Sequence, residues 1–538
     1  MRLDEFIAQA NAGLKGRGSI VIASGLGVVR ICDVTEDSRT VLPGSLFVAR
    51  AGAKADGRAF VSQALKAGAG AILCARGSGI ELEEAGGSSQ RSAVIEADDV
   101  ELAAAVLAET FYGNPSSKLR CVGVTGTNGK TTTTWLLWRL LNGAGKRAGL
   151  IGTVVIDDGN EVARAEMTTP PAIEISRTMS VMVENGCGIA AMEVSSHSLA
   201  QKRVAGLTFG SGVFTNLTQD HLDFHKTMEA YGRTKGELFR MLPAGGLAVV
   251  NADDGASGLM LKGCAARPVR CVQVEENAEA PADGASVRIL EMDRTGMKLG
   301  LKGPFGAIDA WVPLIGPFNA MNVLQAVVCA FECGMSAQEI ARGCARLDAP
   351  PGRLERVPTR GDEPLVLVDF AHTEDGLRNA LSTAGRVKGD GRLIAVFGCG
   401  GDKDRTKRPK MGRVASEIAD VAIVTSDNPR SERPGAIVDA VLEGVDNKDR
   451  TKVSVQVDRR RAIFHAISFA RANDIVVIAG KGHETEQIMP DGQGGTVTHH
   501  FDDREVAKEA IAERRASMRG SRAQSRTSEP ETGVAAES

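Results

Sequence analysis

The sequence predicts an α/β fold made of three domains around mainly parallel sheets. Short apolar runs alternate with amphipathic helical patterns along most of the chain, as they do in successive βαβ units. Several apolar runs lead directly into glycine-rich or polar segments, which is typical of strands that end in the loops of an α/β sheet. The chain has 538 residues, and because a domain usually takes roughly 100–200 residues, one core is not enough.

The composition is that of a water-soluble protein. Hydrophobic residues make up 43% and charged residues 24%, and the net charge of −3 gives no reason to expect a nucleic-acid partner. The ten cysteines form no C-x-x-C pair, so neither a zinc ribbon nor a disulfide framework is predicted. Neither a signal core nor an apolar run of roughly 18 residues is present. We therefore expect a cytoplasmic protein with no membrane span.

The first predicted domain covers residues 1–117. Strand-like runs at 46–50 and 71–75 flank a helical pattern over 59–68. Turn-forming residues at 113–117 (GNPSS) then predict a linker to the next domain.

The second predicted domain covers residues 118–349 and the third covers 350–512. A breaker cluster at 348–352 (DAPPG) marks the boundary between them. Four strand-like runs lie in the third domain, at 365–370, 393–397, 421–425 and 475–479. Beyond it the composition turns to Arg, Ser, Glu and Gly without periodic apolar residues, so residues 513–538 are predicted to form a disordered tail.

A glycine loop follows the first strand-like run of the second domain, in GVTGTNGKTTTTWLLWRLL. Backbone N–H groups of such a loop and the N-terminus of the following helix attract phosphate oxygens. Lys130 can reach the β- and γ-phosphates, and Thr131 can hold Mg²⁺. Because position 124 is valine, the match is to a short G-x-x-G-K-T loop rather than to the generic P-loop. The alternative is a glycine turn before a helix.

Two polar clusters follow this loop, each at the end of a strand-like run. The run 189–193 (IAAME) ends in Glu193, which is placed to hold Mg²⁺ directly or through water. The run 212–216 leads into a second cluster that contains His221. Alone, His221 is more often an ordinary hydrogen-bonded histidine, but two such clusters after a phosphate loop favour a metal site.

Polar signatures also close the four strand-like runs of the third domain. They read DFAHTE (369–374), GCGGDKD (398–404), SDNPR (426–430) and GKGHE (480–484). Ligands bind beyond the carboxyl ends of parallel strands, so a binding crevice is predicted there. Each signature alone could be a turn, since Asp-Asn-Pro is a good turn former.

Together these motifs resemble the Mur ligase family, which joins amino acids or peptides to a UDP-linked cell-wall precursor. The resemblance rests on GTNGKTT, MEVSSHSL, FTNLTQDHLDFH and YGRTK, and it covers about residues 20–510. It implies an N-terminal UDP-binding α/β domain, a central P-loop-type ATPase domain and a C-terminal Rossmann-like domain. The implied reaction is ATP-dependent amide-bond formation through an acyl phosphate, in peptidoglycan precursor synthesis.

The resemblance also implies the site of ATP chemistry, with ATP and Mg²⁺ as cofactors. In this family a lysine carbamylated by CO₂ supports the second metal ion, and the motif places it at Lys235. The catalytic residues would be Lys130, Glu193, His221 and Lys235. The metal ligands would be Thr131, Glu193, His221 and Lys235 as N6-carboxylysine. ATP would bind Gly126, Thr127, Asn128, Gly129, Lys130, Thr131, Thr132, Asn319, Arg353 and Asp369.

For the two other substrates the resemblance implies one set of contacts each. The UDP-linked substrate would bind Ser38, Ala53, Lys54, Ala55, Thr168, Thr169, Ser195, Gln201 and Arg203. The DNPR signature occurs in members that add meso-diaminopimelate, which would bind Lys403, Asp427, Asn428, Pro429, Arg430, Gly480 and Glu484. Arg430 suits the second carboxylate of diaminopimelate and would repel the ammonium of lysine. Lys403 departs from the arginine that is common in the family.

The expected partners are therefore UDP-N-acetylmuramoyl-dipeptide, meso-diaminopimelate and ATP, with the chain acting as a monomer. One alternative is a lysine-adding member of the family or a folylpolyglutamate synthetase. The DNPR signature and the N-terminal domain disfavour both. The other is a P-loop ATP-binding regulator without ligase activity, which would not need Glu193, His221 and Lys235.

Overall fold

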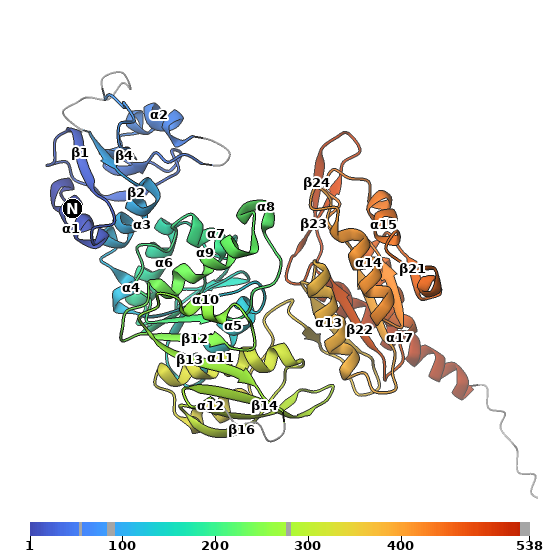
Figure 1. Cartoon of the computed structure of the whole chain (residues 1–538). Coiled ribbons are helices and arrows are strands. Elements are labelled where there is room, and N and C mark those ends of the chain that lie inside the picture. Colours follow the sequence, from blue (N-terminus) through green and yellow to red (C-terminus); the bar gives the residue numbers. More distant parts are fainter. Residues whose placement is uncertain (53–55, 83–91, 276–280, 528–538) are drawn as a thin grey trace, which may run out of the picture. The chain divides into compact units, whose positions relative to one another are not determined.

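The computed structural model describes residues 1–52, 56–82, 92–275 and 281–527, with the side chains of its last helix as far as Met518. The chain divides into two compact units. The first consists of residues 1–290, 299–312 and 318–347, and the second of 291–298, 313–317 and the chain from 348 onward. Figure 1 labels many of the elements named below. Within the described part of the chain, no helix is both long and apolar enough to cross a bilayer.

A five-stranded sheet forms the N-terminal part of the first unit. Its order is β1 (Ile20–Gly25), β5 (Ala93–Ala97), β4 (Ala71–Ala75), β3 (Ser45–Val48) and β2 (Asp33–Thr35), and only the β1–β5 pair is antiparallel. Helices α1 (Leu3–Leu14) and α3 (Val100–Phe111) build the core on one face, and α2 (Val61–Lys66), after the turn η1 (Gly57–Phe60), builds the other. Adjacent residues of β4, such as Ile72 and Leu73, enter opposite cores, as strand geometry requires.

An eleven-stranded sheet forms the rest of the first unit. Its order is β16 (Gly306–Val312), β15 (Met297–Gly303), β14 (Gly284–Met292), β13 (Arg267–Gln273), β12 (Leu247–Asn251), β11 (Ser211–Phe214), β6 (Arg120–Thr125), β10 (Ile189–Glu193), β7 (Ala148–Ile151), β8 (Val155–Asp157) and β9 (Val162–Arg164). The strands from β14 to β7 are parallel to their neighbours, and β8 and β9 continue the sheet antiparallel. The central strands β10 and β11 are buried along their whole length, as expected for a sheet covered on both faces.

Helices cover this sheet and connect its strands. They are α4 (Pro115–Lys118), α5 (Lys130–Gly143), α6 (Ala172–Glu184), α7 (Ser196–Ala200), α8 (Leu222–His225), α9 (Met228–Arg240), α10 (Ser257–Leu261), α11 (Pro317–Glu332) and α12 (Ala337–Cys344). One core joins α6, α7, α9 and α10 to the sheet. Helix α5 packs along β10 and β7, so its N-terminus lies beside the carboxyl ends of the parallel strands.

The second unit contains a six-stranded sheet in the order β17 (Glu355–Val357), β18 (Leu365–Asp369), β22 (Ile475–Ala479), β19 (Leu393–Phe397), β20 (Val421–Val424) and β21 (Val453–Val455). All pairs except β17–β18 are parallel, and the four predicted strands are β18, β19, β20 and β22. Helices α13 (Glu374–Arg386), α14 (Lys407–Ile418) and α15 (Pro434–Leu442) cover one face. The other carries α16 (Arg459–Phe469) and α17 (Asp503–Thr527). The turn η2 (Asn447–Lys452) precedes β21, and the hairpin β23 (Glu486–Pro490) and β24 (Thr496–His500) precedes α17.

The last helix corrects the predicted tail. Helix α17 continues to Thr527, so residues 513–527 are helical rather than disordered as predicted. Its first turns are anchored because Val506 and Ile511 enter the core of the second unit. Arg514 then donates to the carbonyls of α16, and Arg515 pairs with the buried Glu363. These contacts join residues distant in sequence, so composition alone did not reveal them. Residues 528–538 lie outside the described part.

Candidate active site

The glycine loop lies between β6 and α5, as predicted, and both of its glycines are required. Gly126 and Gly129 have φ angles of 151° and 84°, which side chains rarely tolerate. A Cβ on Gly126 would lie 1.9 Å from Thr215 Oγ1, and one on Gly129 would lie 2.7 Å from Asn322 Oδ1. Asn216 accepts from the Thr127 and Asn128 backbone N–H groups, both at 2.9 Å. The loop is therefore fixed in a narrow space at the end of the sheet.

Two lysines converge on this loop. Lys130 Nζ donates to the carbonyl oxygens of Gly126 (3.0 Å) and Thr127 (2.9 Å), and Lys235 Nζ donates to the same Gly126 carbonyl at 2.8 Å. Lys235 is 1% exposed and lies 4.4 Å from the centre of the Tyr231 ring. Burial, followed by the charge of Lys130, lowers the pKa of Lys235 well below its usual value. A neutral amine is the form that reacts with CO₂, so this environment suits the predicted carbamylation.

Glu193 lies at the carboxyl end of β10 and is 1% exposed. Its Oε2 accepts from the hydroxyls of Thr131 (2.9 Å) and Thr153 (3.1 Å), and its Oε1 accepts from Thr153 N–H (2.6 Å). The carboxylate thus lies among oxygen ligands beside the glycine loop, which is the donor set that Mg²⁺ prefers. Thr153, on the loop after β7, was not singled out from the sequence because no local motif marks it.

His221 lies in a group of rings rather than against Glu193. It is the residue before α8 and has a φ of 53°, its Nε2 is 3.4 Å from Asp220, and its ring packs against His197 (4.8 Å) and Tyr231 (6.2 Å) between ring centres. Tyr231 thus connects His221 to Lys235. Among the described residues, no three His, Cys, Asp or Glu side chains are grouped as metal ligands. The structure brings Thr131 and Glu193 together directly, and the role of His221 stays a prediction.

The expected contacts to the UDP-linked substrate in this domain form one cluster. Thr169 Oγ1 donates to the Glu193 carbonyl (2.8 Å) and accepts from Ser195 N–H (3.1 Å), while Arg203 Nη1 donates to the Thr169 carbonyl (2.7 Å). Gln201 accepts from Arg203 (2.6 Å), and Thr168 bonds with the Thr153 hydroxyl (3.1 Å). Five predicted residues are therefore linked to the carboxyl end of β10.

The remaining expected contacts of that substrate lie in the N-terminal sheet domain. Ser38 is half-buried after β2, and its hydroxyl donates to Gln63 Oε1 at 3.2 Å. Ala53, Lys54 and Ala55 lie outside the described residues.

Helix α11 supplies two asparagines to the glycine loop. Asn322 Oδ1 accepts from the Thr133 hydroxyl at 3.2 Å, and its Nδ2 donates to Asn319 Oδ1 at 3.2 Å. The predicted Asn319 is thus held at the loop by Asn322, which the sequence did not single out. The signal was present in GPFNAMN, where the two asparagines are three residues apart and so share a helix face.

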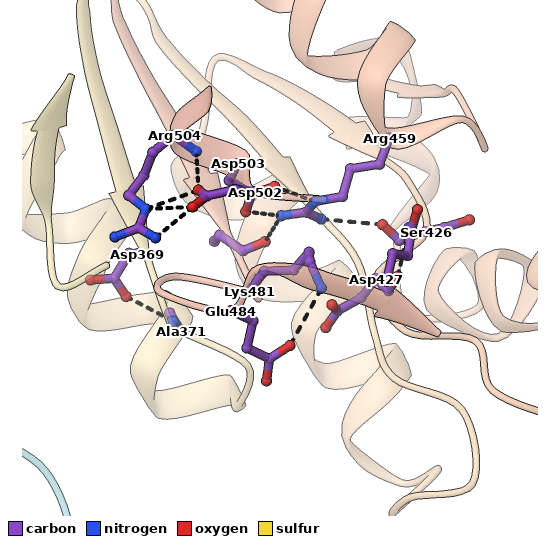
Figure 2. Close-up of polar contacts among 12 residues, drawn as sticks. Asp369, Ala371, Ser426, Asp427, Arg459, Lys481, Glu484, Asp502, Asp503 and Arg504 are labelled. Carbon is purple, nitrogen blue, oxygen red and sulfur yellow. Dashed lines mark hydrogen bonds and ion pairs between the residues drawn. The ribbon is translucent and has the colours of Figure 1, made fainter. Parts of the chain in front are cut away.

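In the second unit, Asp369 and Arg353 lie together at the end of β18. Asp369 accepts from the N–H groups of Leu354 (2.7 Å) and Ala371 (2.8 Å), and the Arg353 guanidinium lies 4.6 Å from the Phe370 ring centre. Figure 2 shows the Asp369–Ala371 contact. Asp369 therefore fixes the two loops around Arg353, and contact of either residue with a nucleotide stays a prediction.

The expected amino-acid contacts gather at the carboxyl ends of β19, β20 and β22. Arg430 has a φ of 54°, and its Nη1 donates to the Gly401 carbonyl at 2.8 Å. A Cβ on Gly401 would lie 1.8 Å from the Pro429 carbonyl oxygen, and one on Gly400 would lie 3.0 Å from Arg430 Nη1 and 3.9 Å from Lys403 Cγ. The glycines of the GCGGDKD loop therefore allow it to approach the DNPR loop, bringing Lys403 and Arg430 to one place.

Carboxylates belong to the same group of residues, which is called the amino-acid pocket below because it is the expected site of the amino acid. Asn428 Nδ2 donates to Glu484 Oε2 at 2.8 Å. Asp427 is 6% exposed, and its buried Oδ1 has no hydrogen-bond partner in the described part of the chain. A Cβ on Gly480 would lie 3.3 Å from Asp427 Oδ2, so Gly480 leaves room for that carboxylate. An unsatisfied buried oxygen is costly unless a ligand supplies a donor, and cations beside carboxylates suit a zwitterionic amino-acid head.

Two buried cations of this region were missed by sequence reasoning. Arg459 and Lys481 have fully buried side chains. Figure 2 shows Arg459 between Asp503 and Ser426, and Lys481 beside Glu484. Lys481 stands within the GKGHE signature, whereas Arg459 is the first residue of α16 and lies outside every polar signature. A local pattern could have flagged the first but not the second.

Comparisons with known proteins match all three parts of the chain. Residues 30–112 match the Mur ligase family catalytic domain, 124–330 the Mur ligase middle domain, and 352–482 the Mur ligase glutamate ligase domain. A UDP-N-acetylmuramoyl-L-alanyl-D-glutamate–2,6-diaminopimelate ligase of Gloeobacter violaceus is 44% identical, over 96% of this chain and 99% of that protein. The enzyme of that name from Syntrophomonas wolfei is 41% identical, over 89% and 94%.

Solved structures agree with these matches. A structure of a UDP-N-acetylmuramoyl-L-alanyl-D-glutamate–2,6-diaminopimelate ligase aligns with a TM-score of 0.64 and 32% identity, over 90% of this chain and 95% of that one. The MurF ligase of Thermotoga maritima in complex with ADP aligns with a TM-score of 0.58 at 18% identity, over 92% and 99%, which shows the shared fold alone.

Proposed function

This chain belongs to the Mur ligase family, and we propose that it adds meso-diaminopimelate to UDP-N-acetylmuramoyl-L-alanyl-D-glutamate at the expense of ATP. The observation that carries the choice of amino acid is the pocket around Arg430. There a guanidinium, held at the Gly401 carbonyl, lies on a loop whose Asn428 bonds Glu484. A cation and a carboxylate in one pocket match the carboxylate and ammonium of the second head of diaminopimelate.

The proposed reaction takes place in two steps. An oxygen of the D-glutamate γ-carboxylate attacks the γ-phosphorus of ATP, so that an acyl phosphate forms and ADP leaves. The amine of diaminopimelate then attacks the acyl carbon, phosphate leaves and the nitrogen loses a proton. Lys130 offsets the repulsion between the carboxylate and the triphosphate, and the N-terminus of α5, at the end of the loop, attracts the phosphate oxygens.

The donor set at Glu193 fits a divalent cation, because carboxylate and hydroxyl oxygens converge beside the loop. We infer that Thr131 and Glu193 hold one Mg²⁺, and that Glu193, His221 and carbamylated Lys235 serve a second. Bound Mg²⁺ supplies positive charge to the phosphate oxygens. We also propose that the chain acts as a monomer on these small-molecule substrates.

Phosphate release tests the proposed function. Release from ATP should require both the UDP-dipeptide and meso-diaminopimelate, and the product should carry one new amide bond by mass spectrometry. A panel with lysine and ornithine in place of diaminopimelate separates the lysine-adding alternative. ATP hydrolysis indifferent to both substrates would instead support an ATP-binding regulator.

Asn322 offers a test of the nucleotide site. Replacing it with alanine removes the support of Asn319 and the acceptor for Thr133, so we expect the KM for ATP to rise about tenfold, which is roughly 1.4 kcal/mol of lost binding. The KM for diaminopimelate should stay within twofold. The matched control is Asn142→Ala, which removes the three hydrogen bonds of an asparagine near the other end of α5. An equal rise for both variants would contradict a specific role of Asn322.

A further inference from the structure

Lys481 is a buried cation among the residues of the amino-acid pocket. It lies on the loop after β22, between Gly480 and Gly482, and its side chain is 0% exposed. An ammonium removed from water is costly unless acceptors surround it. Its acceptors are Asn428 Oδ1 at 3.1 Å, Glu484 Oε2 at 3.4 Å and the Glu486 carbonyl. Two of the three belong to residues expected to hold diaminopimelate.

The orientation of the Asn428 amide depends on Lys481. Asn428 Oδ1 accepts from Lys481 Nζ and from the Ile488 N–H at 3.0 Å. Both partners can only donate, so the oxygen of the amide must face them. Asn428 Nδ2 therefore points to Glu484, where it donates to Oε2 at 2.8 Å.

The consequence falls on the Glu484 carboxylate. Its Oε2 is held by the Asn428 amide and by the Lys481 ammonium, whereas its Oε1 forms no hydrogen bond within the described part of the chain. Without Lys481, the Asn428 amide would be held only by the Ile488 N–H at its oxygen and by Glu484 at its nitrogen, and the ammonium that joins Asn428 Oδ1 to Glu484 Oε2 would be missing. A turned amide would place its oxygen against the Glu484 carboxylate, and two acceptors repel each other.

Other groups also hold the backbone of the pocket. The buried Arg459 pairs with Asp503 at 2.6 Å and donates to the carbonyls of Ser426 (3.2 Å) and Ala479 (3.0 Å). Figure 2 shows that this network and the Lys481–Glu484 contact are separate. Arg459 thus ties the strand ends that carry Asp427 and Lys481, so these strand ends have a support besides Lys481, whose own backbone contact is the Glu486 carbonyl.

We propose that Lys481 is a positioning residue for the amine-bearing substrate. It fixes Asn428 and Glu484 so that Glu484 Oε1 faces the distal ammonium of diaminopimelate. This inference rests on the proposed function, since it names how that pocket recognises one of the two charges of the distal head. The distal carboxylate of diaminopimelate is bound separately, by Arg430.

The test compares two substrates in steady-state kinetics. For Lys481→Met, the KM for meso-diaminopimelate should rise about 10- to 30-fold, while the KM values for ATP and the UDP-dipeptide stay within twofold. With 2-aminopimelate, which keeps the distal carboxylate but lacks the distal amine, kcat/KM should be the same for variant and unaltered enzyme within twofold. The matched control is Lys388→Met, which removes a lysine paired with Asp420 elsewhere in the same unit.

A double variant tests the route through Glu484. Once Glu484→Gln has removed the carboxylate, adding Lys481→Met should raise the KM for diaminopimelate less than threefold further. Independent multiplication of the two effects would overturn the proposal. So would an unchanged KM in Lys481→Met, or an equal loss with 2-aminopimelate, because both indicate a purely structural lysine.

Folding is checked by circular dichroism and urea unfolding. If Lys481→Met does not fold, Lys481→Gln removes the charge but keeps an amide donor at this position, so it must show a smaller loss with diaminopimelate and none with 2-aminopimelate, or the proposal is wrong. Failure of the proposed function is distinguishable, because the unaltered enzyme would then make no product with diaminopimelate. If only the inference fails, the unaltered enzyme is active with diaminopimelate. The Lys481 variants then distinguish diaminopimelate from 2-aminopimelate as well as the unaltered enzyme does.

Discussion

Replacing Lys235 with alanine should lower kcat about 10³-fold, which corresponds to roughly 4 kcal/mol of transition-state stabilisation. The reason is the position of this buried lysine, whose Nζ is 2.8 Å from the Gly126 carbonyl of the phosphate loop. Carbamylation would convert a cation there into a carboxylate that can hold a metal ion close to the phosphates. The measurement is the rate of ADP formation with all three substrates saturating.

Rescue separates a chemical role from a packing role. Formate or acetate should restore part of the activity of Lys235→Ala, because a small carboxylate can enter the space left by the side chain and replace the carbamate. The control is Lys262→Ala, which truncates an exposed lysine of the same domain and should keep full activity. Full activity of Lys235→Ala would contradict the assignment, and failure of rescue by any small acid would argue for packing alone.

Replacing Arg430 with lysine should lower kcat/KM for meso-diaminopimelate about 100-fold and leave the KM for ATP unchanged. A guanidinium can bind a carboxylate through two parallel hydrogen bonds, and an ammonium cannot reproduce this geometry while also holding the Gly401 carbonyl. The expected loss of roughly 2.7 kcal/mol is in the range of charged hydrogen bonds that lose their geometry. Initial rates at varied diaminopimelate concentrations measure it.

Nearby Arg433 provides the control for this change. It is exposed and precedes α15, so Arg433→Lys should behave like the unaltered enzyme. If the unaltered enzyme used lysine and diaminopimelate equally well, the role given to Arg430 in specificity would be wrong. An equal rise in the KM for ATP would show that the substitution had disturbed the domain rather than the pocket.

Features that are continuous in the sequence were predicted well. The strand β6, the glycine loop and the start of α5 form one uninterrupted segment, so composition and order alone identified a phosphate loop. The four polar signatures of the second unit directly follow their strands, and parallel strands place their carboxyl ends at one edge. The sequence therefore predicted that Asp427, Arg430 and Glu484 lie near one another.

Partners that are distant in the chain were not predicted. Thr133 and Asn322 are 189 residues apart, and their contact requires α11 to begin at the phosphate loop. Residues 513–527 were expected to be disordered because their composition is polar, yet they continue a helix whose first turns enter a core. In each case the structure depends on contacts with residues that are distant in the chain, and the composition of the segment does not reveal them.

The sequence by itself determined the α/β class, the phosphate loop and the polar strand ends, because each of these is encoded within a few consecutive residues. Only the tertiary structure decided which groups orient them: Thr153 against Glu193, Asn322 against Gly129, and Lys481 against Asn428 and Glu484. The physical reason is burial. A buried amide, carboxylate or ammonium needs a hydrogen-bond partner. The strand ends and loops that supply this partner are brought together by the fold and cannot be identified from the local sequence.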